Sequence, residues 1–318
     1  MRIRLTQDND ADAIRRLDSL AFSPWWKQLT GTSKDLPPRR HDHILMLLEK
    51  DPEGCFVAEE GGAALGFIFS RTWGRVGWFG TFGVLPEHQG RGIGKQLIAA
   101  SLEYLRRDPQ RVIGLETMPE SPDNLGLYMK QGFEARFLTM LLSKAIDRPP
   151  KNVEPLPLWS QTAEEDHQRW LDELREAADR ITPRLDYTKE VLATTRYDLG
   201  ETLILTENEA AIGMGIVWFS SSREAMHEDE AVVQVMMIHP DYTTEARLHK
   251  LLGAAETLAY VRGKRKLVLA GNAQHGWALT RLLDFNYHID RAMVRMVLKG
   301  TDQGLRTDPY VDLSRWAG

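Results

Sequence analysis

Apolar residues in the first 145 positions recur with two periods, one typical of strands and one typical of helices. Charged and apolar residues alternate from Arg2 to Thr6, which predicts a strand. Residues 78–84 form an apolar run that predicts a central strand. A helix with one buried face is expected where apolar residues are spaced by three, four and seven, at Ile93, Leu97, Ile98, Leu102 and Leu105. The remaining expected elements are helices at 8–22, 41–50 and 122–131, strands at 55–59, 64–73, 111–117 and 133–145, and an irregular segment at 23–40. This alternation predicts a mixed α/β fold.

A glycine-rich stretch joins the central strand to the helix that begins near residue 93. Gly90, Gly92 and Gly94 lie where that helix begins. Glycines let the backbone approach a ligand closely, and the first turn of a helix offers unpaired N–H groups and partial positive charge. The stretch therefore predicts an anion-binding site. A dinucleotide fingerprint would need glycine at position 95 and a P-loop would need Ser or Thr at 96, whereas the chain has Lys95 and Gln96.

The pattern Gln-x-x-Gly-x-Gly after the Val84-Leu85-Pro86 strand exit resembles the acyl-CoA pyrophosphate loop of the GNAT superfamily of N-acyltransferases. The element order over residues 2–146 is similar to the GNAT order, although a glycine-rich turn without a ligand is the alternative. In that family a bulge splays two parallel strands apart, and the acyl-pantetheine chain enters the gap. The resemblance implies that acetyl-CoA is bound as co-substrate, without a metal, by Phe82, Gly83, Val84, Gln89, Gly90, Arg91, Gly92, Ile93, Gly94, Lys95 and Asn124.

The second half of the chain repeats the first. An offset of 154 residues places residues 124–133 on 278–287 and Pro86 on Pro240. At the loop positions the repeat has Thr243, Ala246 and Leu248 in place of Gln89, Gly92 and Gly94, so side chains fill the space where backbone meets phosphate. We therefore expect two tandem GNAT-like domains. The expected bounds are a catalytic domain at 1–147, a proline-rich linker at 148–160, a degenerate copy at 161–300 and a C-terminal tail at 301–318.

Acyl transfer to an amine needs an acid for the leaving thiolate, and the resemblance implies that Tyr128 supplies it. Tyr128 follows Asn124 by four residues on a short helix, so the two share a face. A buried, structural tyrosine is the alternative. The general base is not legible from the sequence. Glu116 is the first candidate, His41, His43 and His88 have a suitable pKa range, and an amine that arrives neutral needs no base.

The acceptor site can only be located approximately. Trp25, Trp26, Trp73 and Trp78 are candidates for its wall, and Asp35 and Asp42 for attracting an ammonium group, although aromatic residues belong more often to the core.

Composition limits which other classes of function the protein can have. The net charge of −5 argues against a nucleic-acid binder, and no apolar run approaches the length of a membrane span. A single cysteine, Cys55, excludes an intramolecular disulfide and favours a cytoplasmic location. We therefore expect an acetyl-CoA-dependent N-acetyltransferase that transfers the acetyl group directly to a primary amine, most simply of a small molecule. A non-catalytic acyl-CoA-binding protein and a protein N-terminal or lysine acetyltransferase are the alternatives, and the sequence is compatible with a homodimer.

Overall fold

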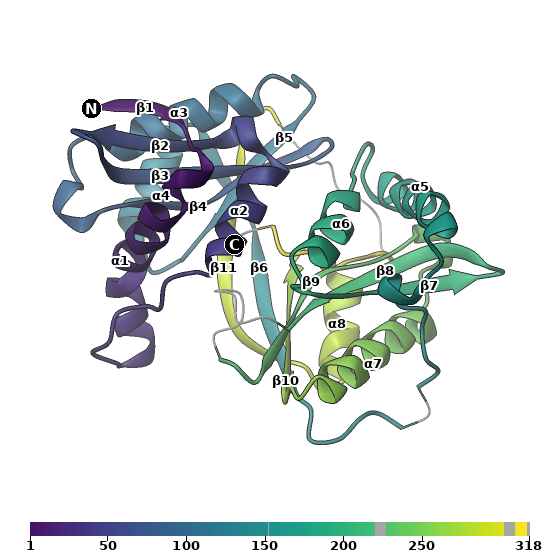
Figure 1. The fold of residues 1–318 in the computed structure, drawn as a ribbon. Coiled ribbons are helices and arrows are strands. Elements are labelled where there is room, and N and C mark those ends of the chain that lie inside the picture. The colour runs from purple at the N-terminus through teal and green to yellow at the C-terminus, as the bar shows by residue number, and fades with distance from the viewer. Residues whose placement is uncertain (152, 220–226, 302–308, 317–318) are drawn as a thin grey trace. The chain divides into compact units, whose positions relative to one another are not determined.

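The computed structural model describes residues 1–151, 153–219, 227–301 and 309–316 (Figure 1). The chain packs into two compact units. Unit 1 contains residues 1–72 and 76–115, and unit 2 contains residues 73–75 and 116–316. Both units combine strands with helices, so the expected mixed α/β class is confirmed.

Unit 1 combines β-strands with helices, and its longer helices bury apolar residues. Its strands neighbour one another in the order β1 (Arg2–Leu5), β2 (Cys55–Glu60), β3 (Ala63–Trp73), β4 (Val76–Val84) and β5 (Val112–Thr117). Its helices are η1 (Asp8–Asp10), α1 (Ala11–Thr30), α2 (His41–Lys50), η2 (Pro52–Gly54), η3 (Pro86–His88) and α3 (Ile93–Leu105). The predicted inner face of α3 is confirmed, because all five apolar residues that define it are buried.

Helix α1 is longer than expected. It continues past Pro24 to Thr30, so the expectation of an irregular segment is wrong for residues 23–30. A proline inside a helix removes one backbone hydrogen bond. Contacts with the following segment support the helix at this point, since Ser19 and Ser23 both bind the backbone of Leu36. The helix then ends at Gly31, which has the positive φ of 68° that a helix terminus favours.

The strands of unit 2 neighbour one another in the order β11-β6-β10-β9-β8-β7, with β12 paired to β9. In Figure 1, α5 and α6 lie on one side of these strands and α7 and α8 on the other. Its elements are α4 (Pro122–Lys130), β6 (Phe133–Ala145), η4 (Trp159–Gln161), α5 (Glu164–Ile181), α6 (Thr188–Arg196), β7 (Gly200–Glu207), β8 (Ala210–Trp218), β9 (Glu230–Ile238), η5 (Pro240–Tyr242), α7 (Glu245–Val261), β10 (Lys266–Asn272), α8 (Gly276–Asp284), β11 (His288–Leu298) and β12 (Val311–Asp312).

The predicted internal repeat is present in the backbone. The offset of 154 residues places β4 on β9, η3 on η5 and α4 on α8, residue for residue. The same offset relates the pairing of the parallel strands in the two copies. In the first copy Val76 pairs with Val112, and in the second Glu230 pairs with Lys266. Both copies therefore build the same strand-turn-helix framework.

The last strand of the first copy pairs with strands of the second. Strand β6 of the first copy pairs antiparallel with both β10 and β11 of the second. Packing therefore assigns β6 to unit 2, and the division between units falls within β5 rather than in the proline-rich segment. The domain bounds expected from sequence follow the repeat instead, and they stay a prediction.

Parts of the expected linker and tail, residues 152, 302–308 and 317–318, lie outside the described residues. Among the helices that the structure describes, none has the length and apolar character needed to cross a membrane.

Candidate active site

The glycine-rich loop of unit 1 presents backbone N–H groups at the start of α3. Gly90 and Gly92 have φ values of 77° and 78°, in the left-handed region that glycine adopts at little cost. The first helical hydrogen bond runs from the Gln96 N–H to the Gly92 carbonyl over 3.3 Å. The N–H groups of Ile93, Gly94 and Lys95 precede that bond and so have no acceptor within the helix. The loop therefore has the donors and the dipole of an anion site.

Side chains around the loop are held in different ways. The Gln89 amide donates to the Val84 carbonyl over 3.2 Å, which ties the loop to the end of β4. Arg91 pairs with Glu60 at 2.9 Å and contacts His88 at 2.8 Å, and this pairing lowers the pKa of the Glu60 carboxyl. Lys95 is exposed and makes no ion pair within the described part of the chain. Lys95 is thus the cation with freedom to meet a phosphate, whereas Arg91 would first have to leave Glu60.

The expected divergence of two parallel strands is confirmed. Strands β4 and β5 pair only from Val76↔Val112 to Trp78↔Gly114, although β4 continues to Val84. Gly80 lies just beyond the last pair, with a φ of 152°. The strand edge over residues 79–84, which contains the predicted ligand-binding positions Phe82, Gly83 and Val84, is therefore not paired with β5. Such an edge can accept an extended chain that carries its own amide groups.

Close packing brings the loop against this strand. A Cβ atom added at Gly94 would lie 3.0 Å from Cζ of Phe82, so a side chain there would displace the phenyl ring. On the other side of the strand, a Cβ at Gly83 would lie 3.0 Å from the Ala21 Cβ of α1. Glycine is therefore required for two different physical reasons. Neighbouring atoms leave little room for a side chain at Gly83 and Gly94, whereas Gly90 and Gly92 have a positive φ.

One buried ion pair of unit 1 was not predicted. Arg39 donates to Asp18 over 3.2 Å and to the hydroxyl of Thr81 in β4 over 3.0 Å, and the charged side chains are 1% and 0% exposed. The pair fixes the segment after α1 next to the edge of β4. A sequence signal did exist, because Asp18 follows Ile14 by four residues and so falls on the apolar face of its helix.

Asn124 and Tyr128 belong to unit 2, on α4. Tyr128 is buried, and its ring packs edge-on against Phe133 with the centroids 6.4 Å apart. Burial raises the pKa of the Tyr128 phenol above its usual value, so the hydroxyl keeps its proton at neutral pH. Asn124 is exposed one turn earlier. The structure therefore gives Tyr128 the protonation state of an acid and leaves the Asn124 amide accessible.

Glu116 belongs to unit 2 as well, at the end of β5, where it is clamped. Its Oε1 accepts hydrogen bonds from Nη2 and Nε of Arg295 over 2.7 and 3.1 Å and from the Thr139 hydroxyl over 2.5 Å. Both charged side chains are 2% exposed. The carboxylate is therefore held in one position, and it could remove a proton from an amine only through its other oxygen or through water.

Other candidates from the sequence have structural partners. Trp73 and Trp78 are fully buried, so the expectation that they line an acceptor site is wrong. Trp25 and Trp26 of α1 are half-buried. The carboxylates proposed to attract an ammonium group are already paired, Asp35 with Lys27 and Asp42 with Arg40.

The histidines considered as bases are also occupied. His41 contacts Asp12 over 3.0 Å, His88 contacts Arg91, and His43 is 1% exposed. Glu116 therefore remains the candidate general base.

The equivalent loop of the second copy is closed. The hydroxyl of Thr244 accepts from the Arg247 N–H over 3.2 Å, so the start of α7 is capped by its own chain. Leu248, at the position of Gly94, is fully buried. A leucine side chain thus stands where the first copy has a glycine that packs closely against Phe82.

Comparison with known proteins agrees with this geometry. Residues 12–133 match the model of the acetyltransferase (GNAT) family. The chain is 31% identical over 131 residues to a mycothiol acetyltransferase of Pseudarthrobacter chlorophenolicus, a stretch that covers 39% of each chain. It is 35% identical over 126 residues to one of Streptomyces bingchenggensis, again over 39% of each. This chain thus spans about two fifths of the length of the curated relatives it matches.

Solved structures share the fold along nearly the whole chain. A putative acetyltransferase of Pyrococcus horikoshii has a TM-score of 0.69 at 20% identity, covering 99% of this chain and 94% of that one. A tandem GNAT protein from the clavulanic acid biosynthesis pathway has a TM-score of 0.57 at 16% identity, covering 93% and 97%. Residues 12–133 therefore match the acetyltransferase (GNAT) family, and the chain has the fold of tandem GNAT proteins.

Proposed function

We propose that this protein is an acetyl-CoA-dependent N-acetyltransferase that transfers the acetyl group directly to a primary amine of a small molecule. The observation that carries the proposal is the loop of unit 1. The N–H groups of Ile93, Gly94 and Lys95, which have no acceptor among the described residues, follow two glycines with positive φ. The loop lies at the end of a strand that has separated from its parallel neighbour. The first feature suits a pyrophosphate and the second an extended amide-containing arm, which are the two halves of CoA.

The chemistry assigns one role to each group. The amine nitrogen attacks the thioester carbonyl carbon, a C–N bond forms and the C–S bond breaks. A strand N–H near Val84 would stabilise the oxyanion that develops on the carbonyl oxygen. Gln89 supports this assignment, because its hydrogen bond to the Val84 carbonyl fixes the peptide group at the end of the strand.

Tyr128 is assigned as the acid that gives a proton to the departing thiolate. A phenol is protonated at neutral pH and can donate to a departing thiolate. Burial raises the pKa of Tyr128, which keeps the proton on the hydroxyl but by itself makes the phenol a weaker acid, so the assignment rests on the position of Tyr128 and not on its pKa. Asn124 is assigned to bind the pantetheine arm, in keeping with its exposed amide on the same helix.

Glu116 is assigned as the group that takes the proton lost by the amine, through water. Its Oε1 is engaged by Arg295 and Thr139, which leaves Oε2 as the acceptor for such a water. An amine that arrives neutral loses its proton only after attack, so the base need not be strong.

Direct transfer is supported by the state of Cys55. Its side chain is fully buried, its Sγ lies 3.3 Å from the Asp51 carbonyl, and burial raises the pKa of the thiol far above its usual value. A protonated, buried thiol is a poor nucleophile, so an acyl-enzyme at this residue is disfavoured.

The relatives named as mycothiol acetyltransferases support a small-molecule acceptor. A cytoplasmic location belongs to the same proposal, and a homodimer stays a prediction. The rival function is acyl-CoA binding without turnover, and a protein N-terminus or lysine as acceptor is the other alternative.

The test is thermal unfolding with and without acetyl-CoA, followed by an amine screen. A ligand present at 100 times its Kd stabilises a protein by about 2.7 kcal/mol, which shifts the Tm by a few degrees. We expect this shift in the wild type and its loss in Gly92→Trp, which places an indole where the structure leaves open space.

The matched control is Gly263→Trp. Gly263 has a φ of 80° and equally open surroundings, but it follows α7 in the second copy. It therefore carries the same backbone strain and should keep the shift. A wild-type protein without a shift overturns the proposal, and a shift without turnover of any amine favours the non-catalytic alternative.

A further inference from the structure

The second copy also contains two parallel strands that separate. Strands β9 and β10 pair only from Glu230↔Lys266 to Val232↔Val268, and β9 then continues to Ile238. This is the register of β4 and β5 moved by 154 residues. A strand edge that opens in this way leaves backbone groups that need partners. In the second copy the structure shows what occupies that edge.

The occupant is the chain's own segment Tyr310–Trp316. Its strand β12 pairs antiparallel with β9 at Val311↔Ile238 and Asp312↔Met237. The pairing continues through Leu313 N–H to the Met236 carbonyl over 2.8 Å and through Arg315 N–H to the Gln234 carbonyl over 2.9 Å. The segment thus adds a strand to β9 at the place where β10 has moved away.

Contacts from the β10 side close the gap. A Cβ atom added at Gly271 of β10 would lie 3.2 Å from a methyl carbon of Leu313. His275, just after β10, donates from Nδ1 to the Asp312 carbonyl over 2.7 Å, because a carbonyl can only accept. Val311 and Leu313 are fully buried members of the unit 2 core. The segment is therefore packed between the two strands as part of the core.

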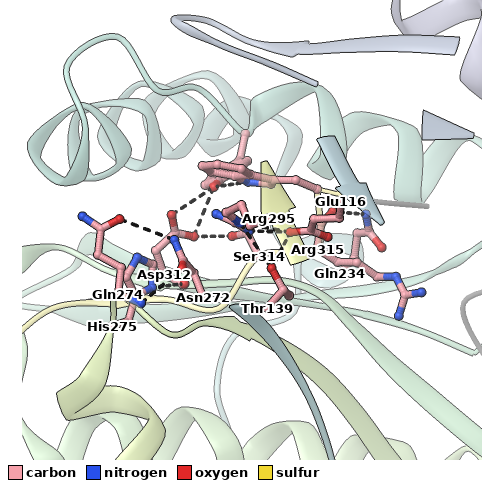
Figure 2. A network of polar contacts seen from close by, with 12 residues as sticks. Glu116, Thr139, Gln234, Asn272, Gln274, His275, Arg295, Asp312, Ser314 and Arg315 are labelled. Carbon is pink, nitrogen blue, oxygen red and sulfur yellow. Dashed lines mark hydrogen bonds and ion pairs between the residues drawn. The ribbon is translucent and has the colours of Figure 1, made fainter. Parts of the chain in front are cut away.

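The polar side chains of the segment extend a network toward Glu116 (Figure 2). The Asp312 carboxylate accepts from the Tyr187 hydroxyl over 3.1 Å and from the Ser314 hydroxyl. Trp316 Nε1 donates to the same Tyr187 oxygen over 2.9 Å.

Trp316 also contacts the clamp on Glu116. The Arg295 guanidinium lies over the Trp316 ring, with its Cζ atom 4.5 Å from the ring centroid, which is the geometry of a cation–π contact. Arg295 in turn binds Glu116. The segment thus packs against one face of the Arg295 guanidinium, which in turn fixes the candidate base Glu116.

We propose that Tyr310–Trp316 is a built-in ligand of the second copy, which takes the strand gap that the first copy offers to the arm of acetyl-CoA. One chain then binds one acetyl-CoA, and the second copy serves to hold Arg295 as a positioning residue for Glu116. The positioning role rests on the proposed function, whereas the occupancy of the gap does not.

Two measurements on the full chain test the occupancy without turnover. Hydrogen exchange should show slow exchange at the amides of Leu313 and Arg315 in the absence of any ligand, and no change on addition of acetyl-CoA. Calorimetric titration with acetyl-CoA should give one site per chain. Fast exchange at these amides, or two sites, overturns the proposal. Slow exchange without any binding of acetyl-CoA leaves the built-in ligand in place and overturns the proposed function instead.

The variant Trp316→Leu tests the positioning role. It removes the contact with Arg295 and the bond to Tyr187, and it keeps the backbone pairing of the segment. We expect kcat to fall by up to about 10²-fold, the loss that a misplacement of about 1 Å can cause, with the KM for acetyl-CoA unchanged.

Trp170→Leu is the matched control. Trp170 is a buried tryptophan of α5 whose indole N–H has no partner among the described residues. This variant should lose stability to a similar extent and keep its kcat. Equal kcat values in the two variants overturn the positioning role.

Discussion

The Oε1 atom of Glu116 lies 2.7 Å from Nη2 of Arg295, and both side chains are 2% exposed. The two residues are 179 positions apart, one at the end of β5 and the other in β11. A buried charge that loses its partner keeps its desolvation cost and gains nothing in return. The candidate base of the first copy therefore depends on a strand that the second copy contributes.

The variant Arg295→Met should destabilise the protein by about 3–5 kcal/mol, the cost of leaving one buried partner unpaired. Urea unfolding followed by tryptophan fluorescence measures the change. The double variant Glu116→Gln/Arg295→Met should recover much of the loss, because a neutral amide is cheaper to bury than a carboxylate. A double variant as unstable as Arg295→Met alone would show that the loss comes from packing rather than from charge.

The variant Tyr128→Phe should lower kcat by at least about 10²-fold, the lower range for loss of a general acid. The thermal shift with acetyl-CoA should be kept, because the ring that packs against Phe133 remains. Release of the CoA thiol gives the rate. The control is Tyr104→Phe, which removes a hydroxyl bound to Asp51 over 3.0 Å in unit 1. Turnover by Tyr128→Phe at the wild-type rate would remove Tyr128 from the mechanism.

Much of the framework was predictable because it depends on local patterns. The spacing of apolar residues in α3 and the glycines before it define a helix start whose geometry follows from the backbone alone. The repeat was visible for the same reason, since Pro86 and Pro240 mark equivalent turns. These features needed no knowledge of distant contacts.

The features that could not be predicted are those made by residues far apart in sequence. Arg295 reaches Glu116 across 179 positions, and no local pattern in β11 indicates it. The segment 310–316 looked like a tail, because a short stretch gives too few residues to show a period. Trp73 is aromatic in a strand, a pattern that occurs more often in a core but is also compatible with a ligand wall, and its burial places it in the core.

Cys55 should resist thiol reagents in the folded protein. Its side chain is fully buried and burial raises the pKa of the thiol, so neither access nor the reactive thiolate is available. Titration with a chromogenic disulfide should detect no thiol in the native protein and one after unfolding. Acetyl-CoA labelled in the acetyl group should leave no label on the protein. Stable label that disappears in Cys55→Ala would contradict direct transfer.

His275 should make the stability of unit 2 depend on pH below neutrality. Burial, assisted by the charge of Arg295, lowers the pKa of His275 to about 3, whereas an unfolded histidine has a pKa of about 6.5. Between these values the unfolded chain takes up a proton that the folded chain does not. The free energy of unfolding therefore falls as pH drops below 6.5, by about 1.4 kcal/mol per unit, and is unaffected by this group above 6.5.

The variant His275→Asn keeps a donor for the Asp312 carbonyl but removes the titrating ring. Urea unfolding at pH 7.5 and pH 5.5 should show a drop in wild-type stability that exceeds the drop in the variant by about 1.4 kcal/mol. Other groups titrate in both proteins, so the comparison isolates His275. The control is His288→Asn, on the exposed part of β11, which should behave as the wild type. An equal drop in wild type and His275→Asn would mean that the ring already takes up a proton in the folded state, through an opening of the 310–316 segment that the built-in ligand should prevent.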